Sequence, residues 1–273
     1  MDYIEFEIEF DQLEPWRDIL VSLLAEKGFD SFVETKSGLQ SYIPKSNYNE
    51  EDFEEIRTFE HVVSVDVKVI EDQNWNAKWE ENFEPVLIEN KIAIKAPFHK
   101  GEFVQDLVLT IQPQMSFGTG HHQTTWLMAK RLYELDLNGK NMLDMGTGTG
   151  VLAILAEKRG ASAVFAPDID EWSFNNAKEN CALNNCYKIE VALGDHQTIT
   201  DKSFDVIAAN INKNVLIEHF LVYSKCLKTS GKLLISGFFE TDVNDLVQTA
   251  QEHGFIFEET FTREGWAMVQ FTV

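Results

Sequence analysis

A run of alternating glycines, Asp144-Met145-Gly146-Thr147-Gly148-Thr149-Gly150, separates a strand-like apolar segment from a helix-like one. Glycine has no Cβ atom, so the backbone here can turn sharply and approach a ligand closely. In an open α/β sheet such a turn lies beyond the carboxyl end of its strand, where ligands bind. The N–H groups that open the next helix are expected to be free and to attract an acidic group of the ligand. Gly146 and Gly148 are therefore predicted to contact a small molecule.

A carboxylate follows at the spacing expected for a ribose. Asp168 lies 22 residues after Gly146, at the end of the next predicted strand, where it could accept hydrogen bonds from ribose hydroxyls. A dinucleotide site would have the pattern G-x-G-x-x-G, but position 151 is Val151. The pattern G-x-G-x-G after an acidic residue resembles class I methyltransferases instead. We therefore predict that the cofactor is S-adenosylmethionine.

Two further segments could complete this site. Thr125 ends a second glycine-rich run that begins at Met115. The run either caps a helix through a hydroxyl or forms a wall of the pocket, with Thr125 donating to the carboxylate of the cofactor. Asn210, after another predicted strand, either belongs to a helix cap or faces the methyl acceptor, which makes it the candidate catalytic residue. His121 and His122 are adjacent and point apart, and no further ligand lies at suitable spacing, so we predict no metal site.

The segments around these residues alternate between helix and strand. Helices are predicted at 124–134, 151–159, 171–183, 215–227 and 242–253, and strands at 142–145, 163–166, 204–209 and 232–236. This order indicates a mostly parallel sheet covered on both faces. The segments 255–262 and 266–272 are predicted to form a closing antiparallel hairpin.

The first 70 residues have a different pattern. Ile4, Phe6, Ile8 and Phe10 alternate with glutamates, as in a strand with one wet face. A helix around residues 16–24, strands at 31–35 and 39–43, a helix at 50–59 and alternating valines from 63 to 69 follow. The order β-α-β-β-α-β is that of a ferredoxin-like α+β domain. Strands at 91–96 and 107–111 are predicted to lead into the larger domain.

Between these regions, residues 74–83 are predicted to form a helix with Trp75, Trp79 and Phe83 on one stripe, which is typical of packing. We thus predict an α+β domain at 1–70, a linker helix at 71–88 and a Rossmann-like, seven-stranded methyltransferase domain of α/β class at 89–273.

Charge and composition limit the partners. The 273 residues carry a net charge of −22, which disfavours direct binding to nucleic-acid phosphates. Residues 1–70 hold 6 Lys and Arg against 17 Asp and Glu, so the small domain could attract a basic protein over a distance. No apolar run is long enough to span a membrane. Three cysteines without paired spacing favour a reducing compartment, and we expect a cytoplasmic monomer.

The chain resembles the PrmA family, whose members methylate protein eleven of the large ribosomal subunit. Five segments carry this resemblance: Met115–Thr125, Leu143–Gly150, Asp168-Ile169-Asp170, Ala209-Asn210-Ile211 and Arg263-Glu264-Gly265-Trp266. The resemblance covers essentially the whole chain. It implies that the small domain holds the basic ribosomal protein and the large domain holds the methyl donor, with Thr125, Gly146, Asp168 and Asn210 as donor-binding positions. The chain departs from the family pattern at Gln112, Gln114 and His122-Gln123, in a loop expected to face the acceptor.

The implied reaction transfers methyl groups to amino groups, either lysine side chains or the N-terminus. Deprotonating a lysine with a pKa of about 10.4 costs roughly 4–5 kcal/mol at pH 7. An apolar pocket lowers the pKa of the amine and therefore this cost. We expect no dedicated general base, and we expect Asn210 and the carbonyl of Ile211 to orient the nitrogen. Two alternatives stay open: methylation of another protein or of a nucleic acid, and a non-catalytic module that only binds S-adenosylmethionine.

Overall fold

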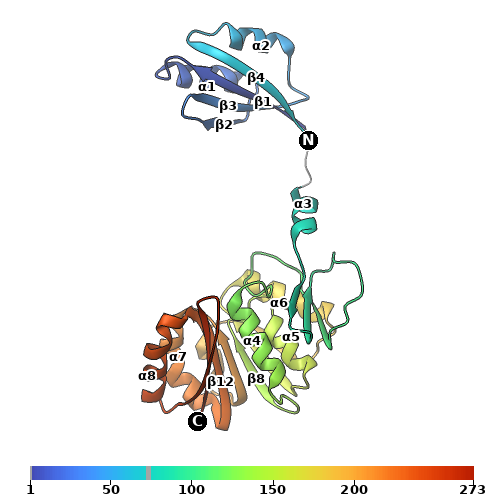
Figure 1. Cartoon of the computed structure of the whole chain (residues 1–273), viewed down its shortest axis with the longest axis vertical. Coiled ribbons are helices and arrows are strands. Elements are labelled where there is room, and N and C mark those ends of the chain that lie inside the picture. Colours follow the sequence, from blue (N-terminus) through green and yellow to red (C-terminus); the bar gives the residue numbers. More distant parts are fainter. Residues whose placement is uncertain (1, 72–74) are drawn as a thin grey trace. The chain divides into compact units, whose positions relative to one another are not determined.

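The computed structural model describes residues 2–71 and 75–273, and at 50–53 and 75–78 it describes the backbone alone. The chain divides into two compact units, Met1–Asn82 and Phe83–Val273, which Figure 1 labels by their helices and strands. The boundary falls inside the segment predicted as a linker. The helix α3 (Trp75–Asn82) occupies part of that segment, while Asn74 and the side chain of Trp75 lie outside the described residues.

The first unit is a four-stranded antiparallel sheet with two helices, in the order that the alternating sequence predicts. Within the described residues the strands are arranged β2-β3-β1-β4. The elements are β1 (Tyr3–Phe10), α1 (Trp16–Glu26), β2 (Ser31–Glu34), β3 (Gly38–Pro44), α2 (Glu50–Arg57) and β4 (Val62–Ile70).

The alternation along β1 separates a core face from a polar face. Ile4, Phe6 and Ile8 are buried in one cluster with Leu20 of α1 and Ile56 of α2. The intervening glutamates point to the opposite face, because successive side chains of a strand alternate. That face is therefore acidic, and β4 brings a single lysine to it opposite the glutamates of β1.

The second unit contains a seven-stranded sheet in the order β10-β9-β8-β11-β12-β14-β13. In the described chain its neighbouring strands are parallel except where β14 pairs with β12 and β13. The strands are β8 (Asn141–Met145), β9 (Ala163–Asp168), β10 (Ile189–Leu193), β11 (Phe204–Asn210), β12 (Leu227–Phe239), β13 (Ile256–Arg263) and β14 (Trp266–Thr272).

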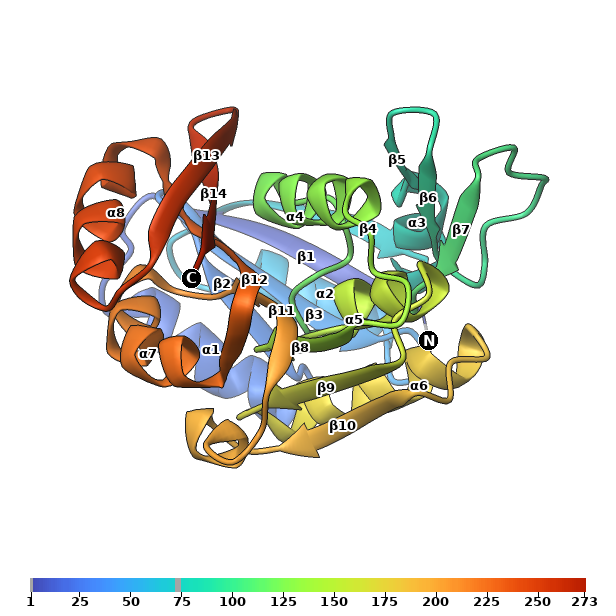
Figure 2. The ribbon, with the colours of Figure 1, turned by 90° about the horizontal axis from the view of Figure 1, so that it is seen from below.

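Helices cover both faces of this sheet. They are α4 (Gln123–Glu134), α5 (Val151–Lys158), α6 (Glu171–Leu183), α7 (Lys213–Cys226) and α8 (Val243–Glu252), with short 3-10 turns η1 (His196–Ile199) and η2 (Glu240–Asp242). Met142 packs in a buried cluster with α4, α5 and α6, whereas its neighbour Leu143 packs in another with α7 and α8. Figure 2 shows α5 beside β8, and α7 and α8 grouped near β12 and β13. The mostly parallel sheet covered on both faces, and its closing hairpin, are as predicted.

Two strands were missed by the sequence analysis. The sheet edge β10 is only partly buried, and β5 (Val86–Ile88) is three residues long, so neither leaves a clear apolar pattern. With β6 (Ile92–Lys95) and β7 (Leu107–Thr110), β5 forms a separate three-stranded sheet. Strand β12 also extends well beyond the predicted 232–236. Among the described residues there is no helix with the length and apolar character to cross a bilayer.

Candidate active site

The glycine turn is packed between two other loops. Gly146 and Gly148 have φ angles of 72° and 57°, in the left-handed region that favours glycine. A Cβ atom on Gly148 would lie 2.2 Å from the carbonyl oxygen of Phe117, and one on Gly146 would lie 2.4 Å from Cγ2 of Ile211. Neither position has room for a side chain, so the glycines are required by packing as well as by backbone conformation.

The acidic residue before the turn has a structural role. The buried carboxylate of Asp144 accepts hydrogen bonds through Oδ2 from Oγ1 of Thr147 at 2.7 Å and from the backbone N–H of Ala153 at 3.1 Å. Burial raises its pKa from 3.8 to about 6. The expectation that the first N–H groups of α5 are all free for a ligand is therefore wrong, because Asp144 occupies that of Ala153.

The predicted ribose carboxylate is held by the turn itself. Asp168 ends β9, and its Oδ2 accepts from the backbone N–H of Gly148 at 2.8 Å. Its Oδ1 accepts from the N–H of Asp170 at 3.0 Å, and Asp170 in turn caps α6 by accepting from the N–H of Trp172. The position of this carboxylate is thus fixed by the backbone of two neighbouring loops.

A cavity of about 640 Å³ lies beyond the ends of these strands. It brings together four of the five predicted site residues: Gly146, Gly148, Asp168 and Asn210. Its apolar walls include Met145, Ile169, Ile211 and Val215, and its volume lies within the range of small-molecule sites. The cavity thus brings together the glycine turn, the end of β9 and the end of β11, which are distant in the sequence.

The fifth residue, Thr125, does not line this cavity. It is fully buried in the first turn of α4, beside a narrow space of about 10 Å³ that Gly146 and Asn210 also line. Its Oγ1 lies 3.4 Å from Nδ2 of Asn210, which can donate to it. The other polar atom of Asn210, Oδ1, is buried and has no hydrogen-bond partner among the described residues. A buried amide oxygen of this kind is a site where a ligand donor is expected.

A second cavity, of about 270 Å³, opens on the other side of Asn210. Phe117, Asn210 and Ile211 line both cavities, while His122, Gly237 and Trp266 line only this second one. The ring of His122 lies 4.5 Å from that of Trp266 and 5.1 Å from that of Phe117, measured between centroids. The two cavities therefore meet at Asn210. The first has the carboxylate of Asp168 in its wall, and the second, called the aromatic cavity below, has the rings of Phe117, His122 and Trp266.

The second glycine-rich run does cap α4, but the cap is the imidazole of His122 and not a hydroxyl. Its Nδ1 accepts from the backbone N–H of Thr124 at 3.3 Å, and burial lowers its pKa below 6.5. The same Nδ1 also lies 2.8 Å from Oγ1 of Thr124. Among the described residues, no group of His, Cys, Asp and Glu is arranged to hold a metal ion.

The sequence analysis also missed a histidine pair in the large cavity. His196 and His219 both line it, with ring centroids 4.5 Å apart. Nδ1 of the buried His219 lies 3.0 Å from the hydroxyl of Tyr223, one turn further along α7. The four-residue spacing of His219 and Tyr223 is visible in the sequence, but their position in the cavity depends on the fold.

The fold and the cavities together define a class I methyltransferase: an open sheet closed by an antiparallel hairpin, a glycine turn after β8 and a carboxylate at the end of β9. A family model described as "Ribosomal protein L11 methyltransferase (PrmA)" matches residues 17–273. The chain belongs to this family.

Individual relatives agree with this assignment. Proteins named "Ribosomal protein L11 methyltransferase" from Porphyromonas gingivalis and Bacteroides fragilis are 42% and 40% identical, and each covers 100% of this chain. The chain covers 98% and 100% of those proteins, respectively. The crystal structure of a ribosomal protein L11 methylase from Lactobacillus delbrueckii subsp. bulgaricus superposes with a TM-score of 0.64 at 27% identity. That match covers 70% of this chain and 98% of the other.

Proposed function

We propose that this chain transfers methyl groups from S-adenosylmethionine to amino groups of the large-subunit ribosomal protein for which its relatives are named. The acceptors would be lysine side chains or the N-terminus. The observation that carries the proposal is the meeting of two cavities at Asn210, one of them built on the glycine turn and Asp168. Family membership supports the same cofactor and the same substrate.

The residues of the large cavity fit S-adenosylmethionine. Gly146 and Gly148 line the cavity with backbone alone, Asp168 offers a fixed carboxylate for ribose hydroxyls, and Oδ1 of Asn210 has no donor among the described residues. When bound, the cofactor supplies a methyl group activated by its sulfonium. We assign Gly146, Gly148, Asp168 and Asn210 to holding it, with Thr125 acting through Asn210 to which it is hydrogen-bonded.

The second cavity suits the acceptor amine. Its aromatic lining favours the neutral form of an amine, because desolvation disfavours the charged form, and aromatic faces still attract an ammonium group on its way in. Asn210 lies where the two cavities meet, so its side chain can orient the acceptor nitrogen. The carbonyl oxygen of Ile211, the second group expected to orient it, lies against Gly237, where a Cβ atom would come within 2.3 Å.

The acceptor's proton is proposed to leave without a dedicated base. Among the described residues that line the second cavity there is no carboxylate, and His122 is its titratable side chain. Nδ1 of His122 is engaged at the start of α4, 2.8 Å from Oγ1 of Thr124 and 3.3 Å from its backbone nitrogen, so we assign this ring to capping the helix and not to taking the proton. Solvent at the mouth of the cavity is then the proton acceptor, and the protein contributes alignment and desolvation.

We further propose that the first unit recognises the substrate and that it is a ferredoxin-like domain, as its strand order β2-β3-β1-β4 supports. Its open sheet face presents Glu5, Glu7 and Glu9 on one strand. Nζ of Lys68 lies among them, 2.8 Å from a carboxylate oxygen of Glu7 and 3.7 Å from one of Glu5. One lysine does not neutralise three glutamates, so this face keeps a net negative charge. Such a surface attracts a basic protein, and salt screens that attraction.

The test is direct. The purified chain is incubated with isotope-labelled S-adenosylmethionine and the purified ribosomal protein, and mass spectrometry locates each added methyl group. We expect label on amino groups of the ribosomal protein, and none with an Asp168→Ala variant. Donor binding measured by calorimetry without transfer to this protein would contradict the substrate. Absence of donor binding would contradict the enzyme class itself.

A further inference from the structure

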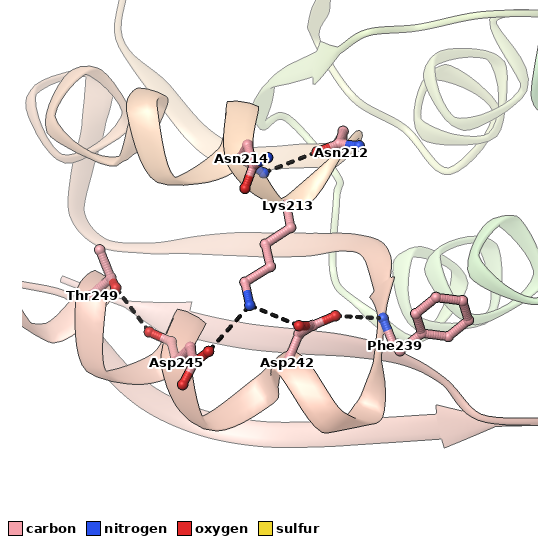
Figure 3. A network of polar contacts seen from close by, with 7 residues as sticks. All are labelled: Asn212, Lys213, Asn214, Phe239, Asp242, Asp245 and Thr249. Atoms are coloured by element: carbon pink, nitrogen blue, oxygen red, sulfur yellow. Dashed lines mark hydrogen bonds and ion pairs between the residues drawn. The ribbon is translucent and has the colours of Figure 1, made fainter.

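Lys213, the first residue of α7, forms two ion pairs that no part of the proposed mechanism uses. Figure 3 shows its Nζ between two carboxylates of the η2–α8 segment. The distances are 2.7 Å to Oδ1 of Asp242 and 3.2 Å to Oδ2 of Asp245. The Lys213 and Asp242 side chains are only 26% and 28% exposed, so this pair is screened less than one at the open surface.

One end of this link holds the segment that faces the acceptor. Lys213 directly follows Asn210-Ile211-Asn212, all three of which line the aromatic cavity. Asn212 caps α7, because its Oδ1 accepts from the backbone N–H of Asn214 at 3.0 Å (Figure 3). Anchoring Lys213 therefore anchors the start of α7 and the three residues before it.

The other end of the link reaches Trp266, another residue that lines the same cavity. Oδ2 of Asp242 accepts from the backbone N–H of Phe239 at 3.3 Å (Figure 3). The ring of Phe239 lies on that of Trp266, with centroids 4.2 Å apart, and Trp266 lines the cavity. A chain of contacts thus runs from Lys213 through Asp242 and Phe239 to Trp266.

We propose that Lys213 is a positioning residue for methyl transfer: its ion pair with Asp242 fixes the separation between the Asn210–Asn212 wall and the Trp266 wall of the acceptor cavity. The inference rests on the proposed function of that cavity. Lys213 itself lines neither cavity, so it touches neither donor nor acceptor. It acts by holding Asn210 and Trp266 at the spacing that an acceptor amine needs, and a small displacement of a reacting group is enough to slow transfer.

The chain offers a matched control. Lys228 and Asp205 form an ion pair of 2.8 Å, near the starts of β12 and β11, whereas Asn210 is at the carboxyl end of β11. Loss of this second pair removes a comparable interaction from the same domain without touching the cavity walls. A general effect on stability would appear in both variants, and an effect on positioning would appear in one.

The experiment compares Lys213→Met, Lys213→Arg and Lys228→Met. Turnover of the ribosomal protein is measured at saturating donor, and donor affinity by calorimetry. For Lys213→Met we expect kcat to fall about tenfold. Donor affinity should fall clearly less, because Asn210 and Ile211 line both cavities whereas Gly146, Gly148 and Asp168 of the donor cavity do not depend on Lys213. Lys213→Arg should recover most of the loss, since it keeps the charge. Lys228→Met should turn over like the wild type.

Three results would overturn the proposal: wild-type kcat in Lys213→Met, a parallel loss of donor affinity, or an equal loss in Lys228→Met. A second readout does not need the acceptor. In fluorotryptophan-labelled protein, the fluorine NMR resonance of Trp266, assigned with Trp266→Phe, should shift in Lys213→Met and not in Lys228→Met. If the wild type fails to methylate the ribosomal protein, the proposed function is wrong, and the Trp266 resonance still decides whether Lys213 positions this wall.

Discussion

The backbone N–H of Gly148 donates to Oδ2 of Asp168 across 2.8 Å, which joins the glycine turn after β8 to the end of β9. The glycine turn and the carboxylate of Asp168, which are separate in the sequence, are therefore directly connected in the fold. Movement of the turn displaces the carboxylate, and movement of the carboxylate leaves a buried N–H group without its partner, which costs about 1–3 kcal/mol. Donor binding should be sensitive to the backbone of the turn as much as to the side chains around it.

Gly148→Ala tests this coupling. The new Cβ atom would lie 2.2 Å from the carbonyl oxygen of Phe117, so the turn or the Phe117 loop must move, and we expect donor affinity to fall by at least about tenfold, or about 1.4 kcal/mol. Gly139→Ala is the control, because Gly139 also has a positive φ, of 70°, but nothing lies within 4 Å of its Cβ position. Calorimetry with S-adenosylmethionine gives both affinities. Equal affinities in the two variants would show that the turn is not coupled to the site.

Asn210→Ala separates alignment from binding. The substitution removes the amide that lies between the two cavities, and we expect kcat to fall about tenfold to a hundredfold, since misplacement of a reacting group carries such costs. Donor affinity should fall less, because Gly146, Gly148 and Asp168 stay in place. Steady-state turnover and calorimetry are measured on the same preparation. Full turnover with unchanged donor affinity would remove Asn210 from the mechanism.

Asp144 should produce a defined pH dependence of stability. Its pKa is raised by burial from 3.8 to about 6, so the folded state binds its proton more tightly than the unfolded state does. The stabilisation is present below about pH 4 and is lost as the pH rises to about 6, with a maximum near 3 kcal/mol. Asp144→Asn cannot ionise, and its amide oxygen can still accept from Thr147 and Ala153.

The free energy of unfolding of Asp144→Asn, relative to the wild type, should therefore rise by about 2–3 kcal/mol between about pH 4 and about pH 7 and stay level above. Urea unfolding of both proteins across that range measures the difference. Subtracting the free energy of unfolding of the wild type from that of the variant removes the contributions of the titrating groups that both proteins share. A constant offset at every pH would mean that the carboxyl of Asp144 is not perturbed in the folded protein.

Much of this site could be predicted from the sequence because its main parts are local. A glycine turn, a strand-end carboxylate and Asn210 each follow a strand, and the carboxyl ends of parallel strands meet at one edge. The aromatic cavity could not be predicted in this way, since His122 and Trp266 are 144 residues apart and meet only when β14 pairs with β12. The ion pair of Lys213 with Asp242 could not be predicted either, because these residues meet only in the folded chain. Strand β10 was missed because an edge strand with partly exposed side chains has no continuous apolar run.

Ionic strength should act on capture of the substrate more than on turnover. Acidic side chains of the first unit are proposed to attract a basic protein, and salt screens exposed charges beyond about 10 Å at 0.1 M. We expect added salt to raise KM for the ribosomal protein several-fold with little change in kcat. A triple variant, Glu5→Gln with Glu7→Gln and Glu9→Gln, should show a higher KM at low salt and a weaker salt dependence.

The control for this variant changes three exposed glutamates of the second unit, Glu190, Glu252 and Glu259, to glutamine. It makes the net charge less negative by the same amount but leaves the open face of the first sheet intact. Its KM and salt dependence should match those of the wild type. If both triple variants respond alike, the overall charge of the protein matters and the position of the acidic face does not.

Asn180 on α6 provides the last test, because it joins the glycine turn to the segment that precedes the second glycine-rich run. Its Nδ2 donates to the carbonyl oxygen of Thr149 at 2.9 Å, and its Oδ1 accepts from the backbone N–H of Gln112 at 2.7 Å. One turn later, Asn184 makes the same two kinds of bond to Thr110, and its Nδ2 also donates to the carbonyl oxygen of Asn180 at 2.8 Å. Both side chains are buried, so replacing either with leucine leaves two backbone groups without these partners, at a cost of about 2–4 kcal/mol.

Asn180→Leu and Asn184→Leu should therefore lose similar free energies of unfolding, measured by urea titration. Their donor affinities should differ, since only Asn180 contacts the glycine turn. We expect Asn180→Leu to bind S-adenosylmethionine about tenfold more weakly than Asn184→Leu, which is about 1.4 kcal/mol. Equal affinities at equal stability would show that the turn keeps its shape without Asn180, and that Asp144 and Asp168 are sufficient to hold it.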